Sequence, residues 1–184
     1  MRVKSASGRQ VDRAAINVAI RDASARDVPT FYRMHADPEA NRAGAFKPRS
    51  KPAFFKHWKK VLKNRLNLKK AIVVDGKVAG YLVSFYRTGT GKPKRREVGY
   101  WIGRKFWGQG LATAGLKILL QGHLIRPLYA RVAKTNPASL KVAQKCGFKK
   151  WKEDSYRNEA GKTVEEDILI LRARPRRQGR PTPA

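Results

Sequence analysis

The sequence predicts an α/β fold organised around one mixed β-sheet, and three patterns support this prediction. Residues 96–122 read as a strand, a glycine-containing loop and an apolar helix. Residues 71–83 read as a hairpin around Asp75-Gly76, a dipeptide typical of primed two-residue turns. Residues 127–133 read as a further strand, joined to the first through one helix, so the two should run parallel by a right-handed crossover. Antiparallel and parallel pairs together make the sheet mixed.

Length and composition predict one domain over residues 18–171. With 184 residues and 41% hydrophobic content, the chain has enough apolar material for a single core. Residues 1–17 are expected to be a flexible basic segment and residues 172–184 a disordered basic tail. One cysteine excludes a disulfide framework and three histidines show no metal-ligand spacing, so we expect a cytoplasmic protein without a metal site. Neither a membrane span nor a signal peptide is recognisable, so no membrane contact is expected.

The charge of the chain is strongly basic. Lysine and arginine number 42 against 13 acidic residues, which gives a formal net charge of +29. Residues 41–70 contain many of these cations and no acid, and the loop at 87–96 is glycine-rich and basic. Such a charge concerns partners rather than fold. It points to nucleic acid, the ribosome or an acidic protein surface, and a plain solvated basic face is the alternative.

Two helices are expected between the first strand and the hairpin. The strand at residues 18–20 leads into a helix in which Ser24 and Asp27 have capping-box spacing and which Pro38 should end. His35 would lie on the inner side of this helix as a packing or surface residue. A second helix begins after Ser50, which is suited to cap it. Its apolar stripe has helical spacing and consists of Phe54, Trp58, Val61 and Leu62.

The loop after the central strand has the features of an anion site. Gly108 and Gly110 permit backbone conformations that other residues avoid, and a buried helix follows them and stops at Gly122. The free N–H groups of the first helical turn and the positive end of the helix dipole face this loop. Arg104 and Lys105 add full charges beside it. A phosphate group is therefore the expected ligand.

Spacing separates three kinds of phosphate-binding loop. The Gly-Lys-Ser/Thr of a Walker loop is absent. A dinucleotide fingerprint fits only in part. Thr113 stands where glycine or alanine is needed, and between the glycine loop and Glu153 there is no acidic residue that could bind a ribose. Acyl-coenzyme A is the third possibility. Glu97-Val-Gly-Tyr-Trp-Ile-Gly, continued by Trp107-Gly-Gln-Gly-Leu-Ala-Thr, resembles the central motif of the GNAT superfamily of N-acetyltransferases. It is most similar to the branch that contains the ribosomal-protein N-terminal acetyltransferases.

A second stretch supports the same resemblance. Asn136, Ser139 and the terminal Gly147-Phe148 are similar to the second motif of the family. The resemblance covers residues 18–171 and implies a mixed, splayed sheet of six to seven strands flanked by about four helices. It also implies that the cofactor is acetyl-coenzyme A (acetyl-CoA), which would bind between the two parallel strands. The linker at residues 43–49 would belong to the acceptor site, with a plain basic loop as the alternative.

The resemblance implies a set of cofactor-binding residues. Backbone N–H groups near residues 101–103 would polarise the carbonyl of the thioester, and those of residues 106–112 would surround the pyrophosphate. Lys105 replaces the glutamine or arginine that is common in the motif, which matters little if the loop binds through its backbone. Asn136 would lie beside the pantetheine arm, and it is also suited to cap a helix. The full set is Trp101, Ile102, Gly103, Lys105, Phe106, Trp107, Gly108, Gln109, Gly110, Leu111, Ala112 and Asn136.

Two residues are candidates for proton transfer. Glu97 heads the central strand in a long stretch that is nearly free of acids, and the resemblance implies that it deprotonates the acceptor amine. The alternative is an ordinary strand residue paired with Arg95 or Arg96. Many relatives donate a proton from a tyrosine where this chain has Ala143, and the resemblance implies Ser139 instead. Its alternative is a polar first-turn residue, with water as the donor.

Two functional classes follow from these observations. The first is an acetyl-CoA-dependent N-acetyltransferase that acts directly on a primary amine, namely a protein N-terminus, with the basic surface docking the ribosome or an acidic partner. The second is a nucleic-acid- or ribosome-binding protein that uses the same fold, with or without acyl transfer. A polyamine acceptor is disfavoured because a strongly cationic protein repels polycations.

Overall fold

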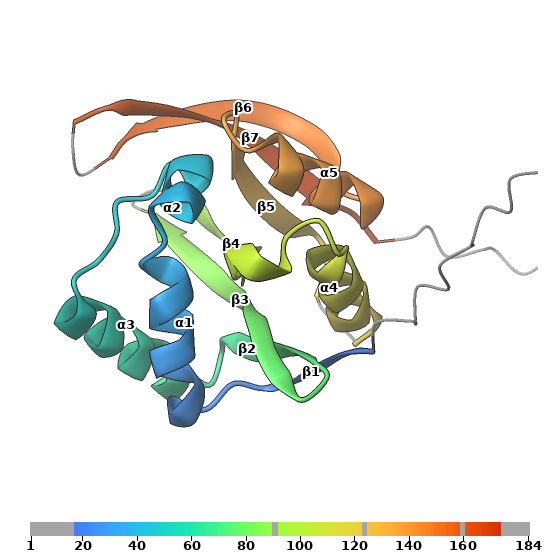
Figure 1. Cartoon of the computed structure of the whole chain (residues 1–184). Helices are drawn as coiled ribbons and strands as arrows, with labels where there is room; N and C mark the ends of the chain where they lie inside the picture. Colours follow the sequence, from blue (N-terminus) through green and yellow to red (C-terminus); the bar gives the residue numbers. More distant parts are fainter. Residues whose placement is uncertain (1–16, 90–91, 123–124, 159–160, 174–184) are drawn as a thin grey trace, which may run out of the picture.

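The computed structural model describes residues 17–89, 92–122, 125–158 and 161–173 (Figure 1). Nearly all of the two predicted end segments therefore lies outside the described residues. The strands are β1 Val18–Asp22, β2 Leu68–Val74, β3 Lys77–Gly89, β4 Lys92–Ile102, β5 Leu128–Ala133, β6 Lys149–Arg157 and β7 Thr163–Leu171. The α-helices are α1 Val28–His35, α2 Pro38–Gly44, α3 Lys51–Lys63, α4 Leu111–Gln121 and α5 Pro137–Lys145. Short 3-10 helices span Ala25–Asp27 (η1) and Arg104–Phe106 (η2).

The strands form one seven-stranded sheet in the order β1-β2-β3-β4-β5-β7-β6. The β4–β5 pair is parallel and the other neighbouring pairs are antiparallel. The prediction of an α/β fold with a mixed sheet of six to seven strands is therefore confirmed, as is the parallel pairing of the two strands that flank α4. In the turn between β2 and β3, Asp75 (φ 47°) and Gly76 (φ 74°) both have positive φ, as a primed turn requires.

The described ranges contain five α-helices, in keeping with the prediction of about four. The first helix ends just before Pro38 as predicted, since α1 stops at His35. Pro38 also begins α2, which was not predicted, because a proline in the first helical turn lacks only an N–H that would have no helical partner. The Asp37 carboxylate caps this helix by accepting hydrogen bonds from the N–H groups of Glu39 (2.9 Å) and Ala40 (3.3 Å). Part of the predicted linker at 43–49 therefore belongs to α2. Ser50 precedes α3 as predicted, but its side chain makes no capping hydrogen bond.

Helices cover both faces of the sheet (Figure 1). Residues of α4 and α5 pack on one face against Ile72, Leu82, Val98, Leu128, Ala130 and Leu169. Residues of α1 and α3 pack on the other face in an aromatic cluster of Phe31, Phe54, Trp58, Tyr81 and Trp101. The entry to α1 is fixed by Asp27, which accepts two hydrogen bonds from Arg21 (2.7 and 2.8 Å) and one from the Ser24 N–H, as the capping-box spacing predicted. No helix in the described ranges is long and apolar enough to cross a membrane.

The parallel pair is the point where the sheet opens. Strands β4 and β5 pair in register at two positions, Arg96 with Leu128 and Glu97 with Tyr129. Strand β3, by contrast, stays paired with β4 as far as Ile102. The rest of β4 therefore has backbone groups on its β5 side that no strand partner uses. This is the splayed arrangement that the sequence resemblance implied.

Candidate active site

The loop from the end of β4 to α4 is open and is shaped by glycines. Gly108 and Gly110 have φ of 74° and 76°, and a Cβ built at either position would meet nothing within 4 Å. Their role is therefore conformational rather than steric. Gly110 is the N-cap of α4 and offers no side chain to the first turn, so the first N–H groups of the helix stay available. The indole N–H of Trp107 donates to the Ile102 carbonyl (2.8 Å), which stabilises the loop. The Trp107 side chain is itself 42% exposed, so it does not fill the space that the loop encloses.

Helix α5 faces β4 across the opening between β4 and β5. The Asn136 Oδ1 accepts a hydrogen bond from the Ser139 N–H (3.0 Å), so the predicted capping role of Asn136 is confirmed, while its amide N–H groups can serve another acceptor. The Tyr100 hydroxyl donates to the Ser139 carbonyl (2.8 Å), which ties β4 to the first turn of α5. Burial raises the pKa of Tyr100 to about 12 against the opposing effect of this hydrogen bond, so the phenol stays protonated.

Glu97 lies on the face of β4 that is turned away from α4 and α5. Side chains alternate along a strand, so Glu97, Gly99 and Trp101 share this face, while Val98 and Tyr100 lie on the other. The Glu97 side chain is 6% exposed, and its carboxylate accepts a hydrogen bond from the Arg87 Nε (2.8 Å). Gly99 leaves a gap in the row of side chains, because a Cβ there would meet only Val83, at 3.5 Å.

The predicted partners of Glu97 are wrong. Arg96 points to the other face, where its Nε donates to the Ser84 Oγ (3.0 Å). Arg95 has its guanidinium 4.5 Å from the ring centroid of Trp151. Glu97 is nevertheless ion-paired, with Arg87 on the neighbouring strand. The β3–β4 register explains this pair, because it brings residue 85 opposite residue 97 and residue 87 one step diagonal to it.

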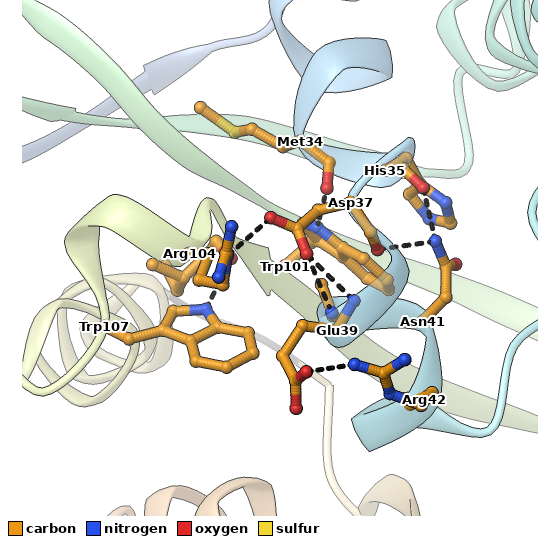
Figure 2. A network of polar contacts seen from close by, with 11 residues as sticks. Met34, His35, Asp37, Glu39, Asn41, Arg42, Trp101, Arg104 and Trp107 are labelled. Atoms are coloured by element: carbon orange, nitrogen blue, oxygen red, sulfur yellow. Dashed lines mark hydrogen bonds and ion pairs between the residues drawn. The ribbon is translucent and has the colours of Figure 1, made fainter.

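A polar network joins the α1–α2 junction to the end of β4 (Figure 2). The Trp101 indole N–H donates to the Met34 carbonyl (3.2 Å), and the Arg104 Nε donates to the Asp37 carboxylate (2.7 Å). The Asn41 Nδ2 donates to the carbonyls of His35 (2.7 Å) and Asp37 (2.8 Å). The charge of Arg104 is thus directed to Asp37, rather than to the glycine loop as its sequence position suggested.

His35 is part of the aromatic packing at this junction. Its ring stacks on Trp101 with centroids 3.9 Å apart and an interplanar angle of 15°, so its predicted role as a packing residue is confirmed. Burial, aided by the positive charges of Arg49 and of protonated His57, lowers the pKa of His35 to about 4. The imidazole is therefore neutral at physiological pH. Phe46, in the predicted acceptor linker, lies beside both rings and is 52% exposed.

Several residues of the Glu97 face were not identified from the sequence. Arg131 on β5 is ion-paired with Glu166 (2.6 Å) and Asp154 (3.0 Å). Burial opposes its charge, but these two carboxylates raise the pKa of Arg131, and the charge of Glu97 adds to the rise. These contacts join strands far apart in the chain, so only the order of strands in the sheet could have revealed them.

The fold and the glycine loop together define the class of protein. A sheet that opens at the parallel β4–β5 pair, with a helix N-terminus at the opening, is an α/β arrangement suited to a ligand that carries phosphate and an extended arm. The chain belongs to the GNAT acetyltransferase family, because the family model described as an acetyltransferase (GNAT) domain matches residues 17–149.

Solved structures share this fold at low sequence identity. RimL, described as a ribosomal alpha-N-protein acetyltransferase, is 20% identical in its apo form, with 87% of this chain and 92% of RimL covered and a TM-score of 0.71. A spermidine N-acetyltransferase from Vibrio cholerae, in complex with coenzyme A (CoA) and spermine, is 13% identical, with 84% and 95% covered and a TM-score of 0.69. RimL in complex with CoA is 19% identical, with 86% and 95% covered and a TM-score of 0.65. No curated protein sequence matches the chain.

Proposed function

We propose that this protein is an acetyl-CoA-dependent N-acetyltransferase that acts on a primary amine, namely the N-terminus of a protein. The observation that carries the proposal is the opening between β4 and β5, which ends at the glycine loop and the N-terminus of α4. Membership of the GNAT family and the CoA in two of the similar structures support acetyl-CoA as the donor. RimL supports a protein N-terminus as the acceptor, and a cytoplasmic location belongs to the same proposal.

The cofactor would be held mainly by backbone groups. The amides of residues 108–112 would bind the pyrophosphate, because the positive φ of Gly108 and Gly110 turns the chain into α4 without side chains in the way. The amides of Phe106 and Trp107, which the resemblance also implied, do not belong to this set, because they donate to the carbonyls of Gly103 (2.8 Å) and Arg104 (3.0 Å). The pantetheine arm would lie between β4 and β5, beside the free amide hydrogens of Asn136. An N–H of Trp101 or Ile102 would donate to the thioester carbonyl, because the Gly103 N–H already donates to the Ala79 carbonyl (3.0 Å). When bound, acetyl-CoA supplies the activated acetyl group.

Glu97 and Ser139 would move the protons. The gap above Gly99 would admit the acceptor amine next to the Glu97 carboxylate, which accepts a proton from it directly or through a water molecule. Arg87 holds this carboxylate in place through the 2.8 Å hydrogen bond. Ser139, on the first turn of α5, lies across the opening from β4, where its hydroxyl would donate a proton to the departing thiolate.

The basic surface would serve as a docking site for the ribosome or for a nucleic acid. Four exposed lysines of α3 share one side of the helix at spacings of three, four and seven residues: Lys56, Lys59, Lys60 and Lys63. Like charges at these spacings repel one another and destabilise the isolated helix. A phosphate backbone would relieve the repulsion and release counterions, so binding should weaken steeply with salt.

An acetylation screen tests the proposal. Synthetic peptides with free N-termini, spermidine and ribosomal extract are each incubated with the protein and labelled acetyl-CoA. We expect label on peptide or protein N-termini, and loss of that label with Glu97→Gln. Labelling of spermidine alone would contradict the proposed acceptor. Absence of all labelling, together with tight salt-dependent RNA binding, would favour a nucleic-acid-binding protein that has kept the fold.

A further inference from the structure

Arg95 lies on an aromatic shelf beside the proposed acceptor site. Its guanidinium carbon is 4.5 Å from the ring centroid of Trp151 and 5.4 Å from that of Tyr129, and the two rings are 5.4 Å apart. Trp151 remains 37% exposed. Aromatic faces attract a guanidinium but leave its N–H edge unused, so the edge stays available to an anion.

The shelf lies on the same face of the sheet as Glu97. Tyr129 pairs in register with Glu97, and neighbours in register point to the same side. Arg95 precedes Glu97 by two residues on β4, so the two residues also share a face, about 7 Å apart along the strand. The glycine loop follows the other end of β4 (Figure 1). An acceptor that reaches Glu97 from the side opposite the cofactor therefore passes Arg95.

Among the three arginines near Glu97 on this face of the sheet in the described ranges, Arg95 is the one without an ion pair, and Lys152 places a second cation 5.4 Å from the ring centroid of Trp151. Arg87 is paired with Glu97, and Arg131 is paired with Asp154 and Glu166. Within the described ranges, Arg95 has cation–π contacts only, and no carboxylate lies within ion-pair distance of it. A guanidinium held in this way forms charge-assisted hydrogen bonds with a carboxylate.

We propose that Arg95, on the shelf of Tyr129 and Trp151, selects acceptors that carry a carboxylate close to the amine, namely polypeptides with an acidic residue at the second or third position. In an extended peptide, a side chain two residues from the N-terminus is about 7 Å away from it, which matches the separation of Glu97 and Arg95 along β4. This inference rests on the proposed acetyltransferase function and specifies its substrate.

Three peptides of equal length test the selection. They begin Ala-Asp-Asp, Ala-Asn-Asn and Ala-Lys-Lys and are otherwise identical, and kcat/KM is measured for each at low salt with saturating acetyl-CoA. We expect the acidic peptide to exceed the neutral one by about tenfold and the basic one to be the poorest. Arg95→Gln should bring the acidic peptide down to the level of the neutral one, which itself changes little. Arg95→Lys should keep part of the preference because it keeps the charge.

Arg96→Gln is the matched control, since Arg96 is the next residue on β4 but points to the opposite face. It should leave the order of the three peptides unchanged. Equal kcat/KM for the three peptides, or an acidic preference that survives in Arg95→Gln, would overturn the inference without touching the acetyltransferase assignment. Turnover of none of the peptides by a protein that binds acetyl-CoA would also overturn it. Failure to bind acetyl-CoA would instead count against the proposed function.

Discussion

The two faces of β4 meet different surroundings. On one face, Val98 is buried in the core with α4 and α5, and Tyr100 is tied to α5 by one hydrogen bond. On the other face, Glu97 and Trp101 flank a glycine and contact charged and aromatic side chains from distant segments. Apolar packing stabilises the first face, whereas ion pairs and stacked rings stabilise the second. We therefore expect changes on the Glu97 face to alter turnover and pH dependence, and changes on the loop and α5 side to alter cofactor affinity.

The largest effect is expected from Glu97→Gln. Loss of a general base lowers kcat by about 10²–10⁴-fold, while acetyl-CoA affinity should stay the same because the glycine loop is unchanged. Steady-state kinetics and calorimetric titration measure the two quantities. Glu165→Gln is the control, since Glu165 is an exposed carboxylate paired with Lys134 on the β5–β7 side of the sheet. A kcat within twofold of the unmodified protein would remove Glu97 from the mechanism.

The next effect concerns pH and the stacked imidazole of His35. Its pKa is about 4 in the folded chain against 6.5 in the unfolded chain. Between these values the unfolded chain binds a proton that the folded chain excludes, so stability falls as the pH falls through this window. The loss amounts to about 2 kcal/mol between pH 7 and pH 5.

Urea unfolding at the two pH values measures this loss. His35→Phe should flatten the dependence on pH, because it keeps an aromatic ring on Trp101 and removes the titrating group. His57→Gln serves as the comparison and should leave most of the slope in place. If His35→Phe loses as much stability between pH 7 and pH 5 as the unmodified protein, the imidazole is not excluded from protonation in the folded state.

The glycine loop gives an effect of intermediate size. Gly110→Ala introduces a side chain at φ 76°, where there is room for it but the backbone conformation is unfavourable by about 1–2 kcal/mol. The loop should relax, and acetyl-CoA affinity should fall by about tenfold. Gly161→Ala is a matched control, because Gly161 has φ 73° and equally open surroundings in the β6–β7 connection. Similar losses of affinity in both variants would show that the loop has no special role.

The smallest effect separates the two roles of Asn136. Asn136→Ala removes the cap of α5 and should cost about 1 kcal/mol of stability, measured by denaturant unfolding. Asn136→Asp keeps the capping oxygen but loses the amide hydrogens that would face pantetheine. It should therefore retain stability while weakening acetyl-CoA binding. If binding by Asn136→Asp equals that of the unmodified protein, the residue serves only as a cap.

The same contrast explains what could be predicted from the sequence. The glycine loop, the parallel crossover and the cap at Asn136 depend on residues close together in the chain, so their spacing was sufficient. The Arg87–Glu97 and Arg104–Asp37 pairs join segments that are distant or in an unknown register, and sequence proximity instead suggested Arg95 and Arg96 for Glu97. The sequence predicts the end of α1 before Pro38 but not the start of α2, because a proline suits both the end of one helix and the first turn of the next.

The central claim is that the backbone amides of residues 108–112 bind the diphosphate of acetyl-CoA. Calorimetric titration of the protein with acetyl-CoA and with acetyl-pantetheine, which lacks the diphosphate and the nucleotide, tests it most directly, with Gly110→Ala titrated in parallel. We expect acetyl-CoA to bind at least tenfold more tightly than acetyl-pantetheine, and Gly110→Ala to weaken only acetyl-CoA. Equal affinity for the two compounds, or no binding of either, would contradict the claim.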